Sequence, residues 1–452
     1  MDPAPLTLPP DQLRELGRLV VDAIAGHHER LGEDPPLQTG SPAELREALG
    51  GPPPAAPGDP AVAVQTLLDT VLANMQHGDH PRFFARVGSP SNAVSALGDA
   101  LATGFNAFAG SWAGGSGPAA LELVVLDWLR TWLGLPEESE GILVSGGSVA
   151  NLTALAAARE ALPRGAQAWV SDQTHASVLR ALRLLGIAYE VLPSDTGFAL
   201  PAERIPADAA PGIVIGTAGT TNTGAVDPLG FMADLAAAGG HWFHVDAAYG
   251  GPAVLTGRGA ALLAGIERAD SVVLDPHKWL FQPYEIGSVI VRRPGALAQA
   301  FTMFPEYLRD VGVAGEEVAF RDRGPQLSRG SRAIKLWLSL QVFGLDAFRA
   351  AIDRGIDLAE RAAQRIAETP GFEVATPPSL GIVCFRVPGD PDELAARALA
   401  DGYVAPSTTV LRGETLLRFC TINPRTTDQE LDRCVARLAE LAAQPPGPAA
   451  PR

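Results

Sequence analysis

Short apolar runs alternate with helical segments through the middle of the chain. The runs that predict buried β-strands lie at 142–144, 168–171, 189–192, 213–216, 242–246, 272–274 and 288–291. Segments with apolar residues at helical spacing separate most of them, at 149–161, 176–185, 228–238 and 258–266. This alternation predicts βαβ units and therefore an α/β fold, a mostly parallel seven-stranded sheet with helices on both faces. In such sheets ligands bind beyond the carboxyl ends of the strands.

The N-terminal part of the chain has a different pattern. Apolar residues recur at helical spacing over 11–31, and Ser41, Pro42 and Glu44 form a capping pattern for a short helix. A stretch rich in Pro and Gly at 50–60 then precedes a further helix at 64–75. We interpret residues 1–82 as a helical arm with little capacity to fold alone, which should pack on something larger such as a partner subunit.

The C-terminal part begins after a stretch of low periodicity at 305–328. A helical pattern runs through 331–369 and leads into a small α+β unit. Its predicted strands lie at 372–374, 382–387 and 416–422, and its helices at 390–399 and 427–443. Both helices open with capping signatures, at Asp390 and Thr427. We therefore divide the remaining chain into a large domain at 83–330 and a small domain at 331–452.

Composition narrows the class of protein. The 452 residues are 46% hydrophobic and 19% charged, which is typical of a well-buried globular enzyme. The formal net charge of −16 argues against nucleic acid as a main partner, because phosphate binding favours a basic surface. The three cysteines show no zinc-binding spacing, and we expect no metal. No secretory signal or membrane-spanning run is visible, so we expect a soluble cytoplasmic protein without a membrane partner.

Candidate chemistry follows the ends of the predicted strands. After the first strand, Gly147 and Ser148 lie in a turn that opens a helix, where free N–H groups and the helix dipole favour an anion. The turn lacks the motifs that bind dinucleotides and nucleoside triphosphates, so a phosphate monoester is the ligand that it favours. His175 follows another strand and could stack on a flat cofactor. Thr221 follows the next strand and offers a polar contact.

Two further residues complete this set. Asp246 closes an otherwise apolar strand, where an ionised carboxylate is costly unless it is paired. A pyridinium N–H would supply that partner. Lys278 follows a later strand between His277 and Trp279, where desolvation could make its amine available as a nucleophile.

Each of these features has an ordinary structural explanation when it stands alone. The lysine could be a surface residue, the aspartate a helix cap or part of an ion pair, and the histidine a hydrogen-bonded structural residue. Together, however, they supply every contact that pyridoxal 5′-phosphate (PLP) requires, each at the carboxyl end of a different predicted strand.

The motifs around these residues resemble those of the group II PLP-dependent decarboxylases, which include the aromatic-L-amino-acid, histidine and glutamate enzymes. The matching segments are H-P-R-F-F-A at 80–85, D-Q-T-H at 172–175, H-V-D-A-A-Y-G at 244–250 and D-P-H-K-W-L at 275–280. The resemblance covers nearly the whole chain. It implies the PLP fold type I architecture of aminotransferases with a small α+β C-terminal domain, and a homodimer with the active site at its interface.

The resemblance also implies roles for individual residues. Lys278 would form the internal aldimine, Asp246 would pair with the pyridine nitrogen, and His175 would stack on the ring. The remaining cofactor-binding residues would be Gly147 and Ser148 at the phosphate, Thr221 near the substrate carboxylate, Ala248 under the ring, and His277. F-P-E-Y-L at 304–308 matches a loop whose tyrosine protonates the product carbanion, which makes Tyr307 a catalytic candidate together with Lys278, His175 and Asp246.

The chain departs from the family pattern where the substrate side chain would bind. Arg86 and Val87 stand where aromatic-acid decarboxylases have two aromatic residues, and Gly110 replaces a bulky ring near Phe108. Lost ring volume would make room for a large side chain such as indole, whereas an inward-facing Arg86 would attract an acidic one. Arg86 could instead point at solvent or the dimer interface, the orientation that we favour. Asp275 stands where the animal enzymes usually have asparagine, and we expect it to bond away from the phosphate or to be held by an arginine.

These observations predict decarboxylation of an L-amino acid, with an aromatic one as the expected substrate, to the amine and CO₂ through a quinonoid. A decarboxylase of an acidic or aliphatic amino acid and a decarboxylation-dependent aldehyde synthase are the alternatives within this chemistry. An aminotransferase or β-lyase would use the same Asp and Lys. A non-catalytic PLP-binding protein and a nicotinamide-binding protein belong to different classes, and the absence of the dinucleotide motif counts against the second.

Overall fold

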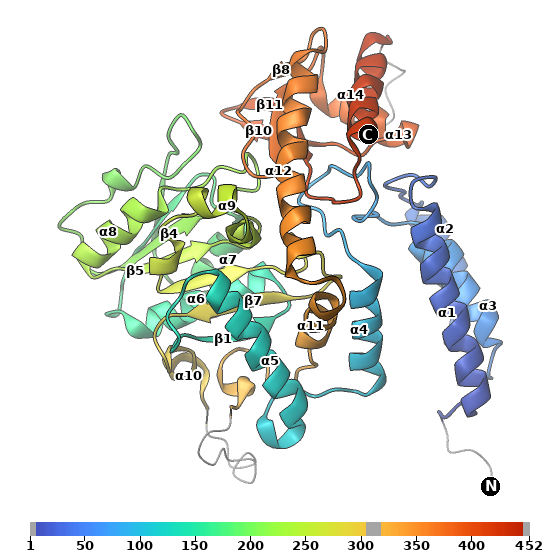
Figure 1. Cartoon of the computed structure of the whole chain (residues 1–452), viewed down its shortest axis with the longest axis horizontal. Coiled ribbons are helices and arrows are strands. Elements are labelled where there is room, and N and C mark those ends of the chain that lie inside the picture. The colour runs from blue at the N-terminus through green and yellow to red at the C-terminus, as the bar shows by residue number, and fades with distance from the viewer. Residues whose placement is uncertain (1–5, 304–317, 446–452) are drawn as a thin grey trace.

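The computed structural model of the protein describes residues 6–303 and 318–445. Its centre is a seven-stranded sheet with the strand order β1-β7-β6-β5-β4-β2-β3 (Figure 1). The strands are β1 (Glu140–Val144), β2 (Ala168–Ser171), β3 (Tyr189–Leu192), β4 (Ile213–Thr217), β5 (Trp242–Asp246), β6 (Ser271–Leu274) and β7 (Gly287–Val291). β7 pairs antiparallel with both of its neighbours, and every other pairing is parallel. The predicted mostly parallel sheet is confirmed.

Helices cover both faces of this sheet, as predicted. The strands β4 and β5 are buried along their whole length, as expected for parallel strands covered on both sides. On one face, His244 and Asp246 of β5 hydrogen-bond to Asn151 of α6 (Gly147–Ala161). On the other, Gly216 of β4 lies against α8 (Leu229–Gly239). The other helices of this part are α4 (Ala93–Gly104), α5 (Trp112–Trp132), α7 (Ala176–Leu185), α9 (Gly257–Leu262) and α10 (Ala296–Phe301). The 3₁₀ turns are η2 (Ala202–Arg204), η3 (Gly251–Leu255), η4 (Ile266–Arg268) and η6 (Phe320–Asp322).

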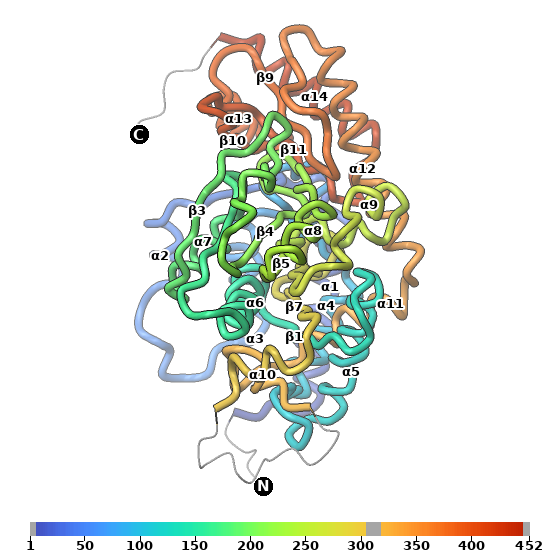
Figure 2. The backbone as a smooth tube through the Cα atoms, turned by 90° about the vertical axis from the view of Figure 1, so that its left-hand side faces the viewer, coloured from blue at the N-terminus to red at the C-terminus, as the bar shows by residue number. Residues whose placement is uncertain are grey.

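A second, antiparallel sheet lies above the central one in the view of Figure 2. Its strands, in the order β10-β11-β9-β8, are β8 (Glu373–Val374), β9 (Ile382–Arg386), β10 (Ser407–Leu411) and β11 (Glu414–Cys420). The associated helices are α11 (Ala333–Phe343), α12 (Leu345–Ala367), α13 (Pro391–Asp401) and α14 (Asp428–Ala443). The caps predicted at Asp390 and Thr427 both form, the second as a full capping box.

Two predictions for this part of the chain were wrong. The helical pattern at 331–369 is two helices, because Gly344 adopts a left-handed φ of 74° that ends α11. Strand β10 was not predicted, because its first residues, Ser407 to Thr409, are polar and lack the apolar run of a buried strand.

The N-terminal helices stand beside the rest of the molecule (Figure 1). They are α1 (Pro10–Arg30), α2 (Pro42–Leu49), α3 (Pro60–Thr66) and the π-helical turn η1 (Leu67–Leu72), and none of them contains a buried residue. The predicted side-chain cap at Ser41 does not form, and Pro42 occupies the first turn instead. Apolar residues of this arm, including Leu13, Val62 and Leu67, are exposed.

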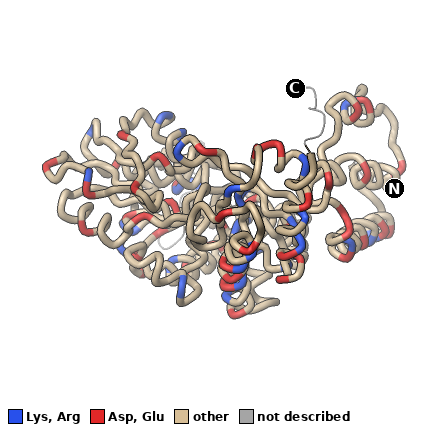
Figure 3. Tube along the Cα trace, turned by 90° about the horizontal axis from the view of Figure 1, so that it is seen from above, with Lys and Arg blue, Asp and Glu red and all other residues tan. Residues whose placement is uncertain are grey.

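Acidic and basic residues are interspersed over the arm and the body (Figure 3). None of the helices in the described parts of the chain combines the length and the apolar character that a bilayer-crossing helix requires.

Candidate active site

A cavity of about 340 Å³ opens at the carboxyl edge of the central sheet. It is lined by Ser145, Gly146, Gly147, Ser148, His175, Ser177, Thr217, Gly219, Thr221, Asp246, Ala248, Tyr249, Asp275, His277 and Lys278. The structure thus brings together all the residues that the sequence proposed for cofactor binding. They come from the segments after β1, β2, β4, β5 and β6, whose carboxyl ends meet at this edge.

The turn between β1 and α6 leaves no space for side chains. A Cβ atom on Gly147 would lie 2.8 Å from the carboxylate oxygen Oδ2 of Asp275 and 3.2 Å from Cβ of Ala248. Gly146 has a φ of 155°, and a Cβ there would lie 2.8 Å from the His277 ring. The start of α6 therefore presents bare backbone to the cavity, and its first N–H groups can bind an anion.

Asp246 is a buried carboxylate that the protein surrounds with hydrogen-bond donors. Its Oδ2 accepts from Nδ2 of Asn151 at 3.0 Å, and its Oδ1 accepts from the backbone N–H of Ala248 at 3.1 Å. No basic side chain of the described residues lies within ion-pairing distance of it. A buried carboxylate with no ion-pair partner among the described residues is suited to a cationic group supplied from outside the chain.

Lys278 forms an ion pair with Asp275, whose Oδ2 lies 3.0 Å from Nζ. Burial lowers the pKa of Lys278, but the charges of Asp275 and Asp246 outweigh it and the pKa is raised overall. The desolvation that the sequence suggested for Lys278 is present, but the two carboxylates act against it. Of the two outcomes expected for Asp275, bonding away from the phosphate or to an arginine, the structure shows a bond to Lys278 and none to an arginine among the described residues, and Oδ1 of Asp275 has no hydrogen-bond partner.

His175 caps the N-terminus of α7 and faces the cavity. Its Nδ1 accepts a hydrogen bond from the backbone N–H of Ser177 at 3.2 Å and lies 2.8 Å from Oγ of the same serine. Because an atom that accepts an N–H carries no proton, the ring proton is on Nε2. Desolvation at the cavity wall also lowers the pKa of His175, which favours the neutral ring.

The residues proposed for the substrate side chain do not line this cavity. The Arg86 side chain is exposed and donates to Oε1 of Gln76 at 2.9 Å, which agrees with the outward orientation that we favoured. Val87 packs against the main hydrophobic core. The expectation of free space near Gly110 was wrong, because a Cβ there would lie 2.4 Å from the ring of Phe108. Tyr307 lies outside the described residues.

Sequence reasoning missed Ser177 and Tyr249, which line the cavity, and Asn151, which lies behind it. Ser177 and Asn151 carry no local signal, although Asn151 follows the glycine turn by one helical turn. Tyr249 stacks on Trp279 with ring centroids 5.3 Å apart, and its hydroxyl accepts from the backbone N–H of Gly381 at 2.8 Å. Tyr249 thus connects the cavity to the segment that leads into β9.

The residues of the cavity fit PLP. The bare glycine turn suits its phosphate, the buried Asp246 suits a protonated ring nitrogen, and Lys278 supplies an amine. A comparison with protein families agrees, because the pyridoxal-dependent decarboxylase conserved domain matches residues 53–388. The chain belongs to the pyridoxal-dependent decarboxylase family. It is a PLP-dependent carboxy-lyase, and the predicted cofactor and reaction class are confirmed.

Relatives of this decarboxylase match over most of their length. It is 41% identical over 469 aligned residues to the aromatic-L-amino-acid decarboxylase of Bacillus atrophaeus, covering 97% of each chain. It is 32% identical to the phenylacetaldehyde synthase of Arabidopsis thaliana, covering 93% of each. The crystal structure of Oryza sativa TDC with PLP and tryptamine superposes with a TM-score of 0.90 at 27% identity, covering 97% of this chain and 99% of that one.

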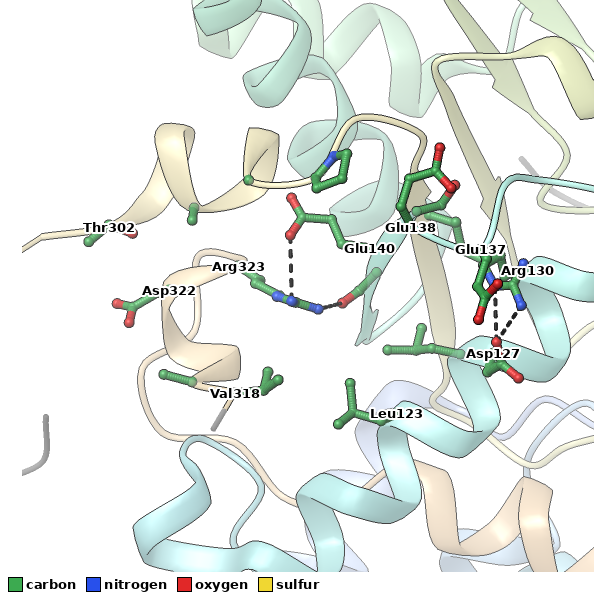
Figure 4. Close-up of a pocket in the computed structure, with 18 residues that line it drawn as sticks. Leu123, Asp127, Arg130, Glu137, Glu138, Glu140, Thr302, Val318, Asp322 and Arg323 are labelled. Carbon is green, nitrogen blue, oxygen red and sulfur yellow. Dashed lines mark hydrogen bonds and ion pairs between the residues drawn. The ribbon is translucent and has the colours of Figure 1, made fainter. Parts of the chain in front are cut away.

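The decarboxylase has a second, larger cavity of about 640 Å³ away from this site (Figure 4). It lies between α5, the start of β1 and the segment around Val318. Arg323 crosses it, donating to the Gly141 carbonyl at 3.2 Å and pairing with Glu140 at 3.5 Å. Arg130 pairs with Asp127 and Arg323 with Glu140 in this cavity, whereas the smaller cavity holds Lys278 and the buried carboxylate of Asp246.

Proposed function

We propose that this enzyme decarboxylates an aromatic L-amino acid to the corresponding amine and CO₂. The observation that carries the proposal is the placement of Lys278 and Asp246 on one cavity beside the glycine turn. The aromatic preference is supported by the similarity to the aromatic-L-amino-acid decarboxylase over 97% of the chain.

The residues predicted to bind the cofactor each have a role in this proposal. The N–H groups at Gly147 and Ser148 hold the cofactor phosphate, Lys278 holds the cofactor through Nζ, and Asp246 faces its ring nitrogen. Bound PLP supplies the electron sink for the reaction. His175, with its proton on Nε2, would contact one face of the bound ring, and Ala248 would contact the other. Thr221 contacts the substrate carboxylate, and His277 completes the wall around Lys278.

Proton return to the product is the step that separates two outcomes. We assign it to Tyr307 together with His175. The similarity to a phenylacetaldehyde synthase supports aldehyde formation with O₂ as the second candidate function. Tyr307 makes simple decarboxylation our prediction, because a proton delivered promptly to the substrate carbon leaves no carbanion for O₂ to trap.

The test is a substrate screen with three readouts. CO₂, amine and hydrogen peroxide are measured with Trp, Tyr, Phe, His, Glu, Asp and branched-chain amino acids. We expect CO₂ and amine in equal amounts from an aromatic substrate, without peroxide, and no turnover by the Lys278→Ala variant. Peroxide and aldehyde as main products would support the synthase, and turnover of Glu alone would contradict the aromatic assignment.

The assembly completes the proposal. We infer a cytoplasmic homodimer with an arm at 1–82, a large domain at 83–330 and a small domain at 331–452. The arm supports the dimer, since its apolar residues are exposed in one chain and its helices contain no buried residue. The cysteines, Cys384, Cys420 and Cys434, are free and buried, which suits a reducing compartment. Light scattering of the full chain and of a chain lacking residues 1–82 would test the arm.

A further inference from the structure

A chain of buried hydrogen bonds runs behind the cavity from β6 to Asp246. Nε1 of Trp242 donates to Oγ of Ser271 at 2.8 Å, and Nδ1 of His244 lies 2.8 Å from the same oxygen. Nε2 of His244 lies 2.9 Å from Oδ1 of Asn151. Nδ2 of Asn151 then donates to Oδ2 of Asp246 at 3.0 Å.

The direction of every bond in this chain is fixed by its two ends. The indole of Trp242 can only donate, and the ionised carboxylate of Asp246 can only accept. Ser271 accepts from Trp242, and because Nε2 of His244 must carry the ring proton to donate to the Asn151 oxygen, Ser271 donates to Nδ1. The fully buried His244 has its pKa lowered to about 4, mainly by desolvation, so it is neutral and donates from Nε2. Its donation holds the Asn151 carboxamide with the oxygen toward His244 and the nitrogen toward Asp246.

The same carboxamide has a second branch. Its Nδ2 also donates to Oγ of Ser177 at 3.0 Å, which leaves the Ser177 hydroxyl hydrogen free to point at Nδ1 of His175. Asn151 therefore contacts the carboxylate of Asp246 directly and acts on His175 through Ser177. It is fully buried and does not itself line the cavity.

We propose that Asn151 is a positioning residue that keeps Asp246 anionic and His175 oriented, with its carboxamide held by His244. This inference rests on the proposed assignment of Asp246 to the cofactor ring nitrogen. The charged or titratable groups that act on Asp246 are Lys278, His175 and His244. None of them donates a hydrogen bond to the carboxylate, so Asn151 is its side-chain donor among the described residues.

The test measures the PLP dissociation constant of each apo-enzyme variant at pH 6 and at pH 8. Each value is compared with that of the wild type at the same pH. Asn151→Leu removes the side-chain hydrogen bond that favours the ionised carboxylate of Asp246. We expect its PLP dissociation constant to rise roughly ten- to hundredfold, with the larger loss at pH 6, because acid favours the protonated form of a carboxyl group that has lost its hydrogen-bond donor. Thr153→Val is the matched control, because Thr153 lies buried on the same helix and its hydroxyl bonds only to the Val149 carbonyl.

Asn151→Asp gives the opposite dependence on pH. Two carboxylates about 3 Å apart must share a proton, and the protonated form can still donate to Asp246. We expect PLP binding by this variant to be weak at pH 8 and to recover at pH 6. A merely structural role for Asn151 would weaken binding equally at both pH values, and that result would overturn the proposal.

A further variant separates this inference from its premise. If Asp246→Ala binds PLP as tightly as the wild type, the assignment of Asp246 to the ring nitrogen is wrong and the proposal falls with it. If Asp246→Ala binds weakly while the Asn151 variants behave like Thr153→Val, the assignment stands and the role of Asn151 is refuted. Neither outcome depends on which amino acid is the substrate.

Discussion

The Nζ atom of Lys278 lies 3.0 Å from the carboxylate oxygen Oδ2 of Asp275, three residues earlier in the chain. The pair is nearly buried, with the Asp275 side chain 2% exposed. The carboxylate therefore holds the lysine as a cation in the chain without cofactor, although an amine must lose its proton before it can attack an aldehyde. We therefore expect Asp275 to influence the pH at which the enzyme takes up PLP.

Asp275→Asn should make PLP uptake possible at lower pH. Because the neutral amide no longer stabilises the ammonium, the pKa of Lys278 should fall. The rate of PLP incorporation into apo-enzyme, followed by absorbance across pH, should shift in the same direction. Asp234→Asn, which removes an exposed partner of Arg268, is the control and should leave the profile unchanged. An unchanged profile in Asp275→Asn would contradict this account.

Glu122→Ala should destabilise the protein strongly. Glu122 and Arg329 form a fully buried ion pair, and Arg329 also donates to the Ala109 carbonyl at 2.9 Å. Removing one partner leaves an uncompensated buried charge, which costs about 3–5 kcal/mol. Denaturant unfolding measures the loss. Asp346→Ala, which breaks the exposed pair with Arg349, should cost less than about 1 kcal/mol. Similar losses in the two variants would refute the interpretation of Glu122.

The central sheet and the outline of the site follow from local sequence. Strands such as 242–246 are short apolar runs, and residues that carry chemistry, such as Asp246 and Lys278, come directly after them. Because the carboxyl ends of parallel strands meet at one edge, the prediction of parallel strands was enough to place these residues at the same edge of the sheet.

The remaining features depend on contacts between distant parts of the chain. Asn151 meets Asp246 and His244 across 95 and 93 residues, and no local pattern marks it. The outward direction of Arg86 depends on a left-handed φ of 55° and on Gln76. The raised pKa of Lys278 depends on how close the Asp275 side chain lies, whereas the sequence shows only their spacing.

His244 should make stability depend on pH. Burial lowers its pKa from 6.5 to about 4, so below pH 6.5 the unfolded chain binds a proton that the folded chain does not. Stability from this residue is therefore lost as the pH falls from 6.5 toward 4, by up to about 1.4 kcal/mol per pH unit. His244→Gln removes this titration. The difference in unfolding free energy between wild type and variant should then shrink as the solution is acidified.

His27 offers a control of opposite sign. Its Nε2 lies 3.5 Å from Oδ2 of Asp79, and the hydrogen bond to Asp79 raises the pKa of His27. Its stabilising contribution is present below pH 6.5 and is lost as the pH rises through the raised pKa. The cost of His27→Gln should therefore be larger at pH 5 than at pH 8. If the costs of His244→Gln and His27→Gln changed with pH in the same direction, a pH effect shared by the whole protein, and not these two contacts, would govern stability.

Gly147→Ala should weaken PLP binding without unfolding the protein. The added methyl group would meet Oδ2 of Asp275 at 2.8 Å and Cβ of Ala248 at 3.2 Å, so the start of α6 or the Asp275 side chain must move. Either movement displaces the N–H groups that face the phosphate or breaks the pair with Lys278, and we expect roughly tenfold weaker binding. Gly117→Ala is the matched control, because nothing lies within 4 Å of its Cβ position. It should bind PLP normally and unfold at the same or a slightly higher temperature. Tight PLP binding by Gly147→Ala would mean that the phosphate is held elsewhere, since the methyl group displaces either the N–H groups of this turn or the Asp275 side chain.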